Sequence, residues 1–307
     1  RPDINLEVGS GSHAVQTAQV MIRFEPVLEE HRPDLVLVVG DVNSTLACSV
    51  VSAKLGIPVA HVEAGIRSFD RSMPEEINRV VTDALSNWLF TPFEEAIENL
   101  RREGIPQEKI YFVGNIMIET LLRAKDIAIQ QKTWQKWDLS PQNYALLTLH
   151  RPSNVDHPGV LRALLEAFQE IASQLPVLFP IHPRTVKRIQ EIGLLDQLQS
   201  TRNLLLVEPQ GYLDFLCLLS QAKMALTDSG SMQAETTMLG VPCLTLRWNT
   251  EWPITITQGT NILVGNDPQR ILAETKKILA GQVKSVTCPE RWDGHVAERI
   301  VHTLLEI

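Results

Sequence analysis

The chain has 307 residues, of which 44% are hydrophobic and 21% charged, as is typical of a globular protein with one large or two medium domains. Its net charge of -8 argues against a general nucleic-acid-binding protein, which would present a basic surface to phosphates. No apolar stretch reaches the about 18 residues of a membrane-spanning helix, and there is no signal-peptide pattern. The scattered cysteines, at positions 48, 217, 243 and 288, form no C-x-x-C pair. We expect reduced and mostly buried thiols, which fits a cytoplasmic location.

Short apolar runs alternate with helical patterns in the first part of the chain. In chain order the patterns predict strands at 34–41, 57–65, 87–93 and 108–115, each followed by a helix, at 43–56, 74–86, 93–104 and 116–126. The helix at 43–56 is expected to have polar capping residues in front and Gly56 at its end. A polar stretch without a pattern follows at 129–143, and it is the best candidate for a domain boundary.

The alternation then restarts and continues to the end of the chain. Strands are predicted at 144–150, 176–182, 203–209, 223–230 and 241–247, with helices at 159–175, 184–195, 211–222 and 231–240 between them and two closing helices at 267–281 and 295–307. Continuous apolar strands that alternate with helices predict parallel sheets covered on both faces. We therefore predict an α/β fold with two Rossmann-like doubly wound domains, at 1–122 and 123–290, and a terminal helix at 291–307. Ligands of such folds bind at the carboxyl ends of strands, here in a cleft between the domains.

Polar residues follow five of these strands at their carboxyl ends. They are Gly40-Asp41, Glu63, His150-Arg151, His182 and Asp228-Ser229-Gly230. Any one of these groups can simply cap a loop, but five of them together indicate a functional site.

The first candidate group is acidic and lies between His61 and Asp83. Glu75, Arg79 and Asp83 are spaced four apart, so they can pair on one helical face. An exposed ladder of ion pairs is the plain interpretation. The alternative is a set of carboxylates near Glu63 that are partly desolvated, so that one acts as a base and another as an acid.

The second and third groups suit an anion. His150, Arg151, His182 and Arg184 resemble an anion clamp, and histidine can protonate a departing phosphate. We expect no metal site, because no carboxylate or cysteine has ligand spacing to either histidine. The segment 227–235 predicts a helix whose first N–H groups hold phosphate, with Glu235 placed to bind a ribose hydroxyl. The G-x-G-x-x-A pattern at 9–14 lacks the context of a dinucleotide site and carries little weight.

Together these motifs resemble the non-hydrolysing UDP-N-acetylglucosamine 2-epimerases. The matching segments, in order, are GDVNSTLA, PVAHVEAGIRSFDRSMPEEINR, KIYFVGN, LHRPSN, EPQGYLDF and TDSGSMQAE. The resemblance implies a GT-B-like pair of domains that interconverts UDP-GlcNAc and UDP-ManNAc for cell-envelope polysaccharides. It implies no cofactor, elimination and re-addition of UDP, a UDP-sugar substrate and a homodimer.

The resemblance also assigns residues by matched position. Asp41, Glu63 and Glu75 become acid/base candidates, with Arg79 organising them, and His150 assists the leaving diphosphate. The substrate-binding positions are Gln210 and Phe215 for the uracil, Ser229, Gly230 and Ser231 for the phosphates, and Glu235 for the ribose. Arg151 and His182 match positions of a second, activating UDP-GlcNAc.

Three departures from the family pattern accompany the match. The first βα units, with their GTRPE phosphate loop, have no counterpart here, so we expect an incomplete first domain and a piece with little activity alone. Ser231 replaces a usual glycine, and Trp252 stands where many members have an arginine. The alternatives are a hydrolysing 2-epimerase, a GT-B-type glycosyltransferase, and a catalytically silent sugar-nucleotide sensor.

Overall fold

The computed structural model describes residues 2–306 and divides into two compact units. The first unit comprises the chain up to Glu119 and from Glu290 onward, and the second comprises Thr120–Pro289. Each unit is built around one parallel sheet, as the alternation of strands and helices predicts. The predicted domain ranges, 1–122, 123–290 and 291–307, stay a prediction.

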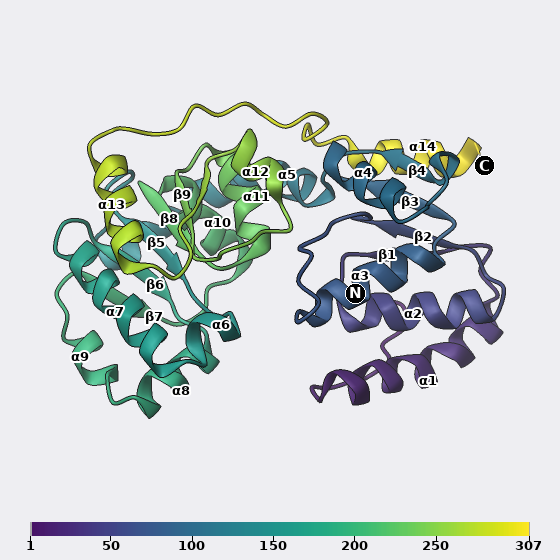
Figure 1. Ribbon diagram of the computed structural model, residues 1–307, viewed down its shortest axis with the longest axis horizontal. Helices are drawn as coiled ribbons and strands as arrows, with labels where there is room; N and C mark the ends of the chain where they lie inside the picture. The colour runs from purple at the N-terminus through teal and green to yellow at the C-terminus, as the bar shows by residue number, and fades with distance from the viewer. Residues whose placement is uncertain (1, 307) are drawn as a thin grey trace. The chain divides into compact units, whose positions relative to one another are not determined.

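The first unit contains a four-stranded parallel sheet in the order β1-β2-β3-β4. Its strands are β1 (Val36–Val39), β2 (Val59–Val62), β3 (Trp88–Thr91) and β4 (Ile110–Phe112). Its helices are α1 (His13–His31), α2 (Asn43–Lys54), α3 (Pro74–Leu85), α4 (Glu94–Arg102) and α14 (Val296–Glu306), with a 3-10 turn, η1, at Gln107–Lys109. Helix α1 lies on α2, which covers the sheet (Figure 1).

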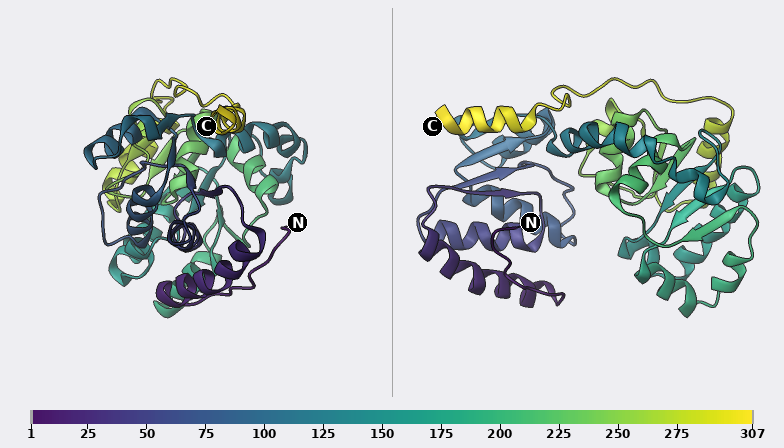
Figure 2. Two further views of the ribbon diagram at one scale, coloured as in Figure 1. Left: turned by 90° about the vertical axis from the view of Figure 1, so that its right-hand side faces the viewer. Right: turned by 180° about the vertical axis from the view of Figure 1, so that it is seen from behind.

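The carboxyl-terminal helix belongs to the first unit. Val296 and Ile300 of α14 pack with Val62 and Phe90 of the sheet, and Figure 2 shows the helix lying along it. The Trp292 indole donates a hydrogen bond of 3.0 Å to the carbonyl of Pro92. This packing returns the chain to its first half after the second unit is complete.

The second unit contains a six-stranded parallel sheet in the order β10-β9-β8-β5-β6-β7. Its strands are β5 (Ala145–Thr148), β6 (Val177–Pro180), β7 (Leu204–Val207), β8 (Met224–Thr227), β9 (Cys243–Thr245) and β10 (Asn261–Leu263). Its helices are α6 (Pro152–Val155), α7 (Pro158–Ala172), α8 (Pro183–Glu191), α9 (Leu195–Gln199), α10 (Tyr212–Gln221), α11 (Gly230–Leu239), α12 (Pro253–Thr257) and α13 (Pro268–Leu279). Helix α5 (Ile116–Gln130) spans the division between the units, and the 3-10 turn η2 (Thr133–Trp137) follows it.

This strand order fixes where a ligand can bind in the second unit. From β5 the chain proceeds outward through β6 and β7, and then returns to the other side of β5 for β8, β9 and β10. The direction of winding therefore reverses between β5 and β8. The crevice at the carboxyl ends of two such strands is the usual binding place of a doubly wound sheet.

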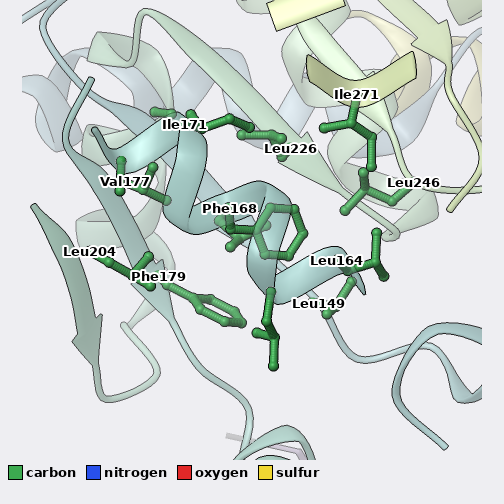
Figure 3. Packing of buried hydrophobic residues seen from close by; sticks show 14 of the residues in the cluster. Leu149, Leu164, Phe168, Ile171, Val177, Phe179, Leu204, Leu226, Leu246 and Ile271 are labelled. Carbon is green, nitrogen blue, oxygen red and sulfur yellow. The ribbon is translucent and has the colours of Figure 1, made fainter. Parts of the chain in front are cut away.

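A well-packed apolar core holds the strands of the second unit in place. Phe168 and Ile171 of α7 are almost wholly buried against the sheet, where they meet Val177, Phe179 and Leu226 (Figure 3). Fully burying one such side chain contributes about 1.5–3 kcal/mol. The strand ends that carry polar residues thus project from a rigid support.

The structure differs from the predicted elements in a few places. Helix α1 was not predicted although it has 19 residues, because it contains Pro26 and only Val20 and Leu28 of it are buried, which leaves a weak apolar period. The short elements α6, α9, α12 and β10 were not predicted either, because three to five residues are too few to show a period. The stretch 129–143 is not irregular throughout, since it contains the end of α5 and η2, in which Trp134 is buried. Helix α2 lacks the expected polar cap, since its N-cap residue is Val42.

The cysteines and the helices bear on two further expectations. All four cysteines are free, as expected; Cys217 and Cys243 are buried, but Cys48 is half-buried and Cys288 is exposed. Within residues 2–306 there is no helix with the length and apolar character needed to cross a bilayer.

Candidate functional site

A hollow of about 220 Å³ lies at the switch point of the second unit. It is lined by Thr148, Leu149, His150, Pro180, His182, Pro209, Gln210, Phe215, Ser229, Ser231, Met232 and Glu235. Seven of these are predicted site residues, and they come from the ends of β5, β6, β7 and β8 and from α10 and α11. The hollow combines apolar walls with a few polar groups, which is the character of a small-ligand site.

His150 is held at this hollow by the buried carboxylate of Asp228. Asp228 accepts hydrogen bonds from the backbone N–H groups of His150 (3.0 Å) and Arg151 (2.8 Å) and from Asn154 (3.1 Å). Nδ1 of His150 lies 3.0 Å from Oδ1 of the same carboxylate. Burial alone would raise the pKa of Asp228, but these hydrogen bonds and the nearby imidazole lower it. An ionised Asp228 fixes the proton of His150 on Nδ1 or stabilises the imidazolium, and Nε2 remains available to a ligand.

The amino terminus of α11 lies at the same hollow. Ser229 is the N-cap residue, and its N–H donates to Oγ1 of Thr227 at 2.9 Å. The hydroxyls of Ser229 and Ser231 lie 3.1 Å apart. The first N–H groups of an α-helix have no partner within the helix and carry a partial positive charge. A phosphate placed here would meet those groups directly.

Glu235 lies one turn further along α11, on the wall of the hollow. Burial raises the pKa of Glu235 from 4.5 to about 7, because a carboxylate loses its hydration there. Within residues 2–306 its carboxyl forms no hydrogen bond, so a ligand hydroxyl could take that place. On the other wall, Nε2 of Gln210 donates to the carbonyl of Glu208 at 2.6 Å, and Phe215 is half-buried on α10.

Two predicted cationic residues do not line the hollow. Arg151 is 3.4 Å from Glu251, and Arg184 forms an ion pair with Asp156. His182 is present there, and its ring centroid is 6.4 Å from that of His150. The clamp predicted from four cations is therefore reduced to the two histidines.

The acidic group lies in the first unit, at the carboxyl ends of β1 and β2. Arg79 is 2% exposed and binds Asp41 at 2.5 Å and Glu76 at 2.7 Å. Glu76 also accepts hydrogen bonds from the N–H groups of Ser68 and Phe69, both at 2.9 Å. The buried guanidinium of Arg79 therefore links Asp41, in the turn after β1, to Glu76 in the first turn of α3.

The predicted ladder of Glu75, Arg79 and Asp83 is wrong. Arg79 pairs with Asp41 and Glu76, and Asp83 is fully buried and pairs with His61 and Arg67. The physical reason is burial, because both side chains point into the unit, where Arg79 also meets Asp41 after β1 and Asp83 meets His61 on β2 and Arg67 in the loop after it. Glu75 is half-buried in the first turn of α3 and takes no part in these pairs.

Glu63 has two unusual properties for a residue at a strand end. Its backbone is left-handed, with φ of 71°, a conformation that costs energy for a residue with a side chain and often marks functional positions. Burial, and then the charge of Asp41, raise the pKa of Glu63 from 4.5 to about 7, although His61 opposes the rise. A carboxyl group with a pKa near the working pH can both accept and donate a proton.

Sequence reasoning missed several residues that support these groups. Asp228 was noted only as part of a strand end, and its four contacts to the 150–154 segment have no sequence signal. Glu251 binds Arg247 at 2.6 Å beneath the start of α11 and was not singled out. In the described part of the chain, no cluster of three or more His, Cys, Asp or Glu residues could hold a metal ion.

Comparisons with known proteins agree on one family. A family model described as UDP-N-acetylglucosamine 2-epimerase matches residues 1–305. A protein of that name from Methanocaldococcus jannaschii is 45% identical over 308 residues, which cover 99% of this chain and 84% of the relative. A UDP-2,3-diacetamido-2,3-dideoxy-D-glucuronate 2-epimerase from Pseudomonas aeruginosa is 39% identical, with 92% of this chain and 78% of the relative covered.

Solved structures give the same result for the fold. The crystal structure of the M. jannaschii UDP-GlcNAc 2-epimerase in complex with UDP-GlcNAc and UDP matches with a TM-score of 0.91 and 44% identity, covering 100% of this chain and 85% of that one. The predicted fold class, α/β with two Rossmann-like units of GT-B-like type that each contain a parallel sheet, is thereby confirmed.

Proposed function

Because the chain belongs to the UDP-N-acetylglucosamine 2-epimerase family, we propose that it interconverts UDP-GlcNAc and UDP-ManNAc without net hydrolysis. The observation that carries the proposal is the hollow between β5 and β8. There the His150 imidazole, backed by the buried Asp228 carboxylate, lies beside the start of α11, whose first N–H groups suit a phosphate. This combination suits a nucleotide diphosphate that must leave and return.

The reaction faces a chemical difficulty that explains the acidic residues. The hydrogen on C2 of the sugar has no adjacent carbonyl, so it is too weakly acidic for simple enolisation. Removing it as a proton while the C1–O bond to UDP breaks gives 2-acetamidoglucal and UDP. Protonation of C2 from the opposite face and return of UDP to C1 complete the inversion, with no redox cofactor required.

Each step needs groups of a definite kind. We assign Asp41, Glu63 and Glu75 to proton transfer at C2, with Arg79 holding Asp41 in place. The pKa of Glu63, raised to about 7, supports its use in both directions of a reversible reaction. We assign His150 to the leaving diphosphate, because an imidazolium stabilises the charge that develops on it.

The remaining predicted residues would hold the nucleotide. Gln210 and Phe215 are assigned to the uracil, the turn of Ser229, Gly230 and Ser231 to the phosphates, and Glu235 to the ribose. Arg151 and His182 are assigned to a second, activating UDP-GlcNAc, and a homodimer is the proposed assembly. Sedimentation with and without UDP-GlcNAc would test the assembly.

The decisive experiment is incubation of the protein with UDP-GlcNAc in deuterium oxide. Formation of UDP-ManNAc with deuterium at C2, at a constant final ratio to UDP-GlcNAc, is the expected result. Free ManNAc that accumulates with UDP would indicate a hydrolysing enzyme instead. Tight UDP binding without any deuterium at C2 would indicate a sensor and contradict the proposal.

Two controls make the result specific. The Glu63→Gln variant should bind UDP but incorporate no deuterium, since the amide cannot take the proton. UDP-2,3-diacetamido-2,3-dideoxy-D-glucuronate, the sugar in the name of the P. aeruginosa relative, should be tested beside UDP-GlcNAc. A much higher rate with it would reassign the substrate within the same reaction type.

A further inference from the structure

His61 lies on β2 with no exposed surface, between the two acidic strand ends. Its Nδ1 atom is 2.6 Å from Oδ1 of Asp83, and its Nε2 atom is 2.8 Å from the carbonyl oxygen of Gly40. A carbonyl oxygen can only accept a hydrogen bond, and so can an ionised carboxylate. A neutral imidazole has one donor and one acceptor nitrogen. Contact with two acceptors therefore requires a proton on both nitrogens of His61.

The charges around His61 lead to the same protonation state. Asp83 is also bound by Arg67 at 2.7 Å, and Arg67 binds Glu103 at 2.6 Å. With an imidazolium, the two carboxylates of this network face two cations. A neutral His61 would leave Arg67 to balance both the fully buried Asp83 and the exposed Glu103, and a buried carboxylate without full compensation is costly. Desolvation alone would lower the pKa of His61, but the charge and hydrogen bond of Asp83 and the Gly40 carbonyl raise it.

His61 also connects the two places from which the acidic residues emerge. Gly40 directly precedes Asp41, has a left-handed backbone with φ of 73°, and donates its N–H to the carbonyl of Val62 at 3.0 Å. The imidazole of His61 forms its Nε2 hydrogen bond with the carbonyl of that same glycine. It thus fixes the turn after β1 from a position two residues before Glu63.

We propose that His61 is a positioning residue in permanently cationic form, which fixes the turn that carries Asp41 and places a positive charge beside Glu63. The catalytic meaning of this inference rests on the proposed function. The protonation state of His61 does not depend on the proposed function and can be tested separately.

The charge has a consequence for proton transfer. The groups that face Glu63 are Asp41, from the turn after β1, and His61, while Asp83 from α3 and Arg67 from the loop after β2 face the imidazole itself. Burial and Asp41 raise the pKa of Glu63 to about 7, and His61 opposes them. Without the imidazolium that pKa should rise further. This upward shift in the pKa of Glu63 is expected whether Glu63 acts as a base or as an acid, since both roles depend on the same ionisation.

The first test is nitrogen NMR of the whole protein with ¹⁵N-labelled histidine. The His61 signals are assigned as those lost in the His61→Gln variant. We expect imidazolium shifts at both ring nitrogens across neutral pH, where a free histidine titrates at about 6.5. A signal pair with one protonated and one bare nitrogen would overturn the inference. If His61→Gln does not fold, Asp83→Asn, which should release the Nδ1 proton, provides the assignment.

The second test compares pH profiles of deuterium incorporation. In His61→Gln the inflection nearest neutral pH should move upward by on the order of one unit. The control is Asn99→Ala, which removes a buried 3.0 Å hydrogen bond to the carbonyl of Gly65 without changing a charge. It should lower stability and leave the inflection in place. A slower His61→Gln enzyme with an unmoved inflection would mean a purely structural histidine. A parent without any incorporation would count against the proposed function, and the NMR result would still decide the charge.

Discussion

A methyl group placed on the α-carbon of Gly230 would lie 2.3 Å from Oε1 of Glu251. Glu251 is almost fully buried and is bound by Arg247 at 2.6 Å and by Arg151 at 3.4 Å. Its carboxylate therefore cannot move aside without breaking ion pairs. The glycine at the start of α11 is required by this contact and not by its backbone angles, which are ordinary. A buried acid beneath the helix thus determines which residue can stand at the start of α11.

Gly230→Ala should therefore destabilise the protein and weaken UDP binding. Displacing Glu251 from its partners breaks a buried ion pair, which typically costs about 3–5 kcal/mol. Gly159→Ala is the matched control, since the same substitution there on α7 meets no atom within 4 Å and should change stability by less than about 1 kcal/mol. Urea unfolding and UDP titration of both variants measure the effect. Equal behaviour of the two would contradict the role given to Glu251.

Asp228→Asn should slow the reaction while UDP still binds. The amide keeps the shape of the side chain, but it removes the charge that stabilises an imidazolium at His150. General acid–base assistance of this kind contributes about 10²–10⁴-fold, so we expect kcat to fall by at least about 10²-fold with a small change in KM.

Asp156→Asn is the control for the loss of a carboxylate in the same unit. Asp156 pairs with Arg184 and Arg188 near the surface, and such pairs contribute about 0–1 kcal/mol. Its kcat should stay close to that of the parent. If Asp228→Asn raised KM and left kcat unchanged, His150 would be a binding residue without a role in the departure of UDP.

The sequence was sufficient to predict the α/β class and most of the strands and helices, although not α1. Parallel strands such as β5 and β8 are continuous apolar runs, and helices such as α7 show a clear period, so both could be located. Polar residues at the strand ends could be located for the same reason, because they interrupt apolar runs. The hollow in the second unit is lined by His150 and Ser229, two of the residues that follow these strands.

The contacts between those residues could not be predicted. Helical spacing allows Arg79 to pair with Glu75, yet it binds Asp41, which is 38 positions away. Asp228 and Glu251 support the site through hydrogen bonds that join distant loops. A sequence pattern indicates which face of a helix or strand is buried, but it does not indicate which buried charged residues form ion pairs with one another.

Arg79→Lys should reduce both stability and activity. The guanidinium of Arg79 binds Asp41 and Glu76 at once, from its two terminal nitrogens, and a lysine ammonium cannot reproduce this fork. Weakening the buried pair with Glu76 should cost up to the about 3–5 kcal/mol that breaking a buried ion pair typically costs. Deuterium incorporation at C2 of the sugar should also fall in Arg79→Lys, since Asp41 would lose its fixed position.

The matched control for this substitution lies on the surface. Arg101 pairs with Glu98, and both side chains are about half exposed, so Arg101→Lys should change the free energy of unfolding by less than about 0.5 kcal/mol. Thermal unfolding of the two variants gives the comparison. Normal deuterium incorporation by Arg79→Lys would show that the position of Asp41 does not matter to proton transfer.

Glu235→Gln should stabilise the free protein and weaken its binding of UDP. The pKa of Glu235 is raised by burial from 4.5 to about 7, so the folded state holds a proton that the unfolded chain releases between these values. The stability of the parent therefore decreases as the pH rises through this interval. A neutral glutamine avoids that loss, and its advantage should be absent below pH 4.5 and reach about 3 kcal/mol above pH 7.

Urea unfolding at both ends of this interval, with and without UDP, separates the two effects. Glu166→Gln, at an exposed position of α7, should show no such dependence on pH. The affinity for UDP should depend on pH in the opposite direction to stability, because an ionised Glu235 accepts hydrogen bonds from ribose hydroxyls more strongly than an amide does. The parent should thus bind UDP more tightly as the pH rises through 7, and the variant should lose that slope. If Glu235→Gln is more stable than the parent but its affinity for UDP depends on pH as that of the parent does, the ribose does not bind at Glu235.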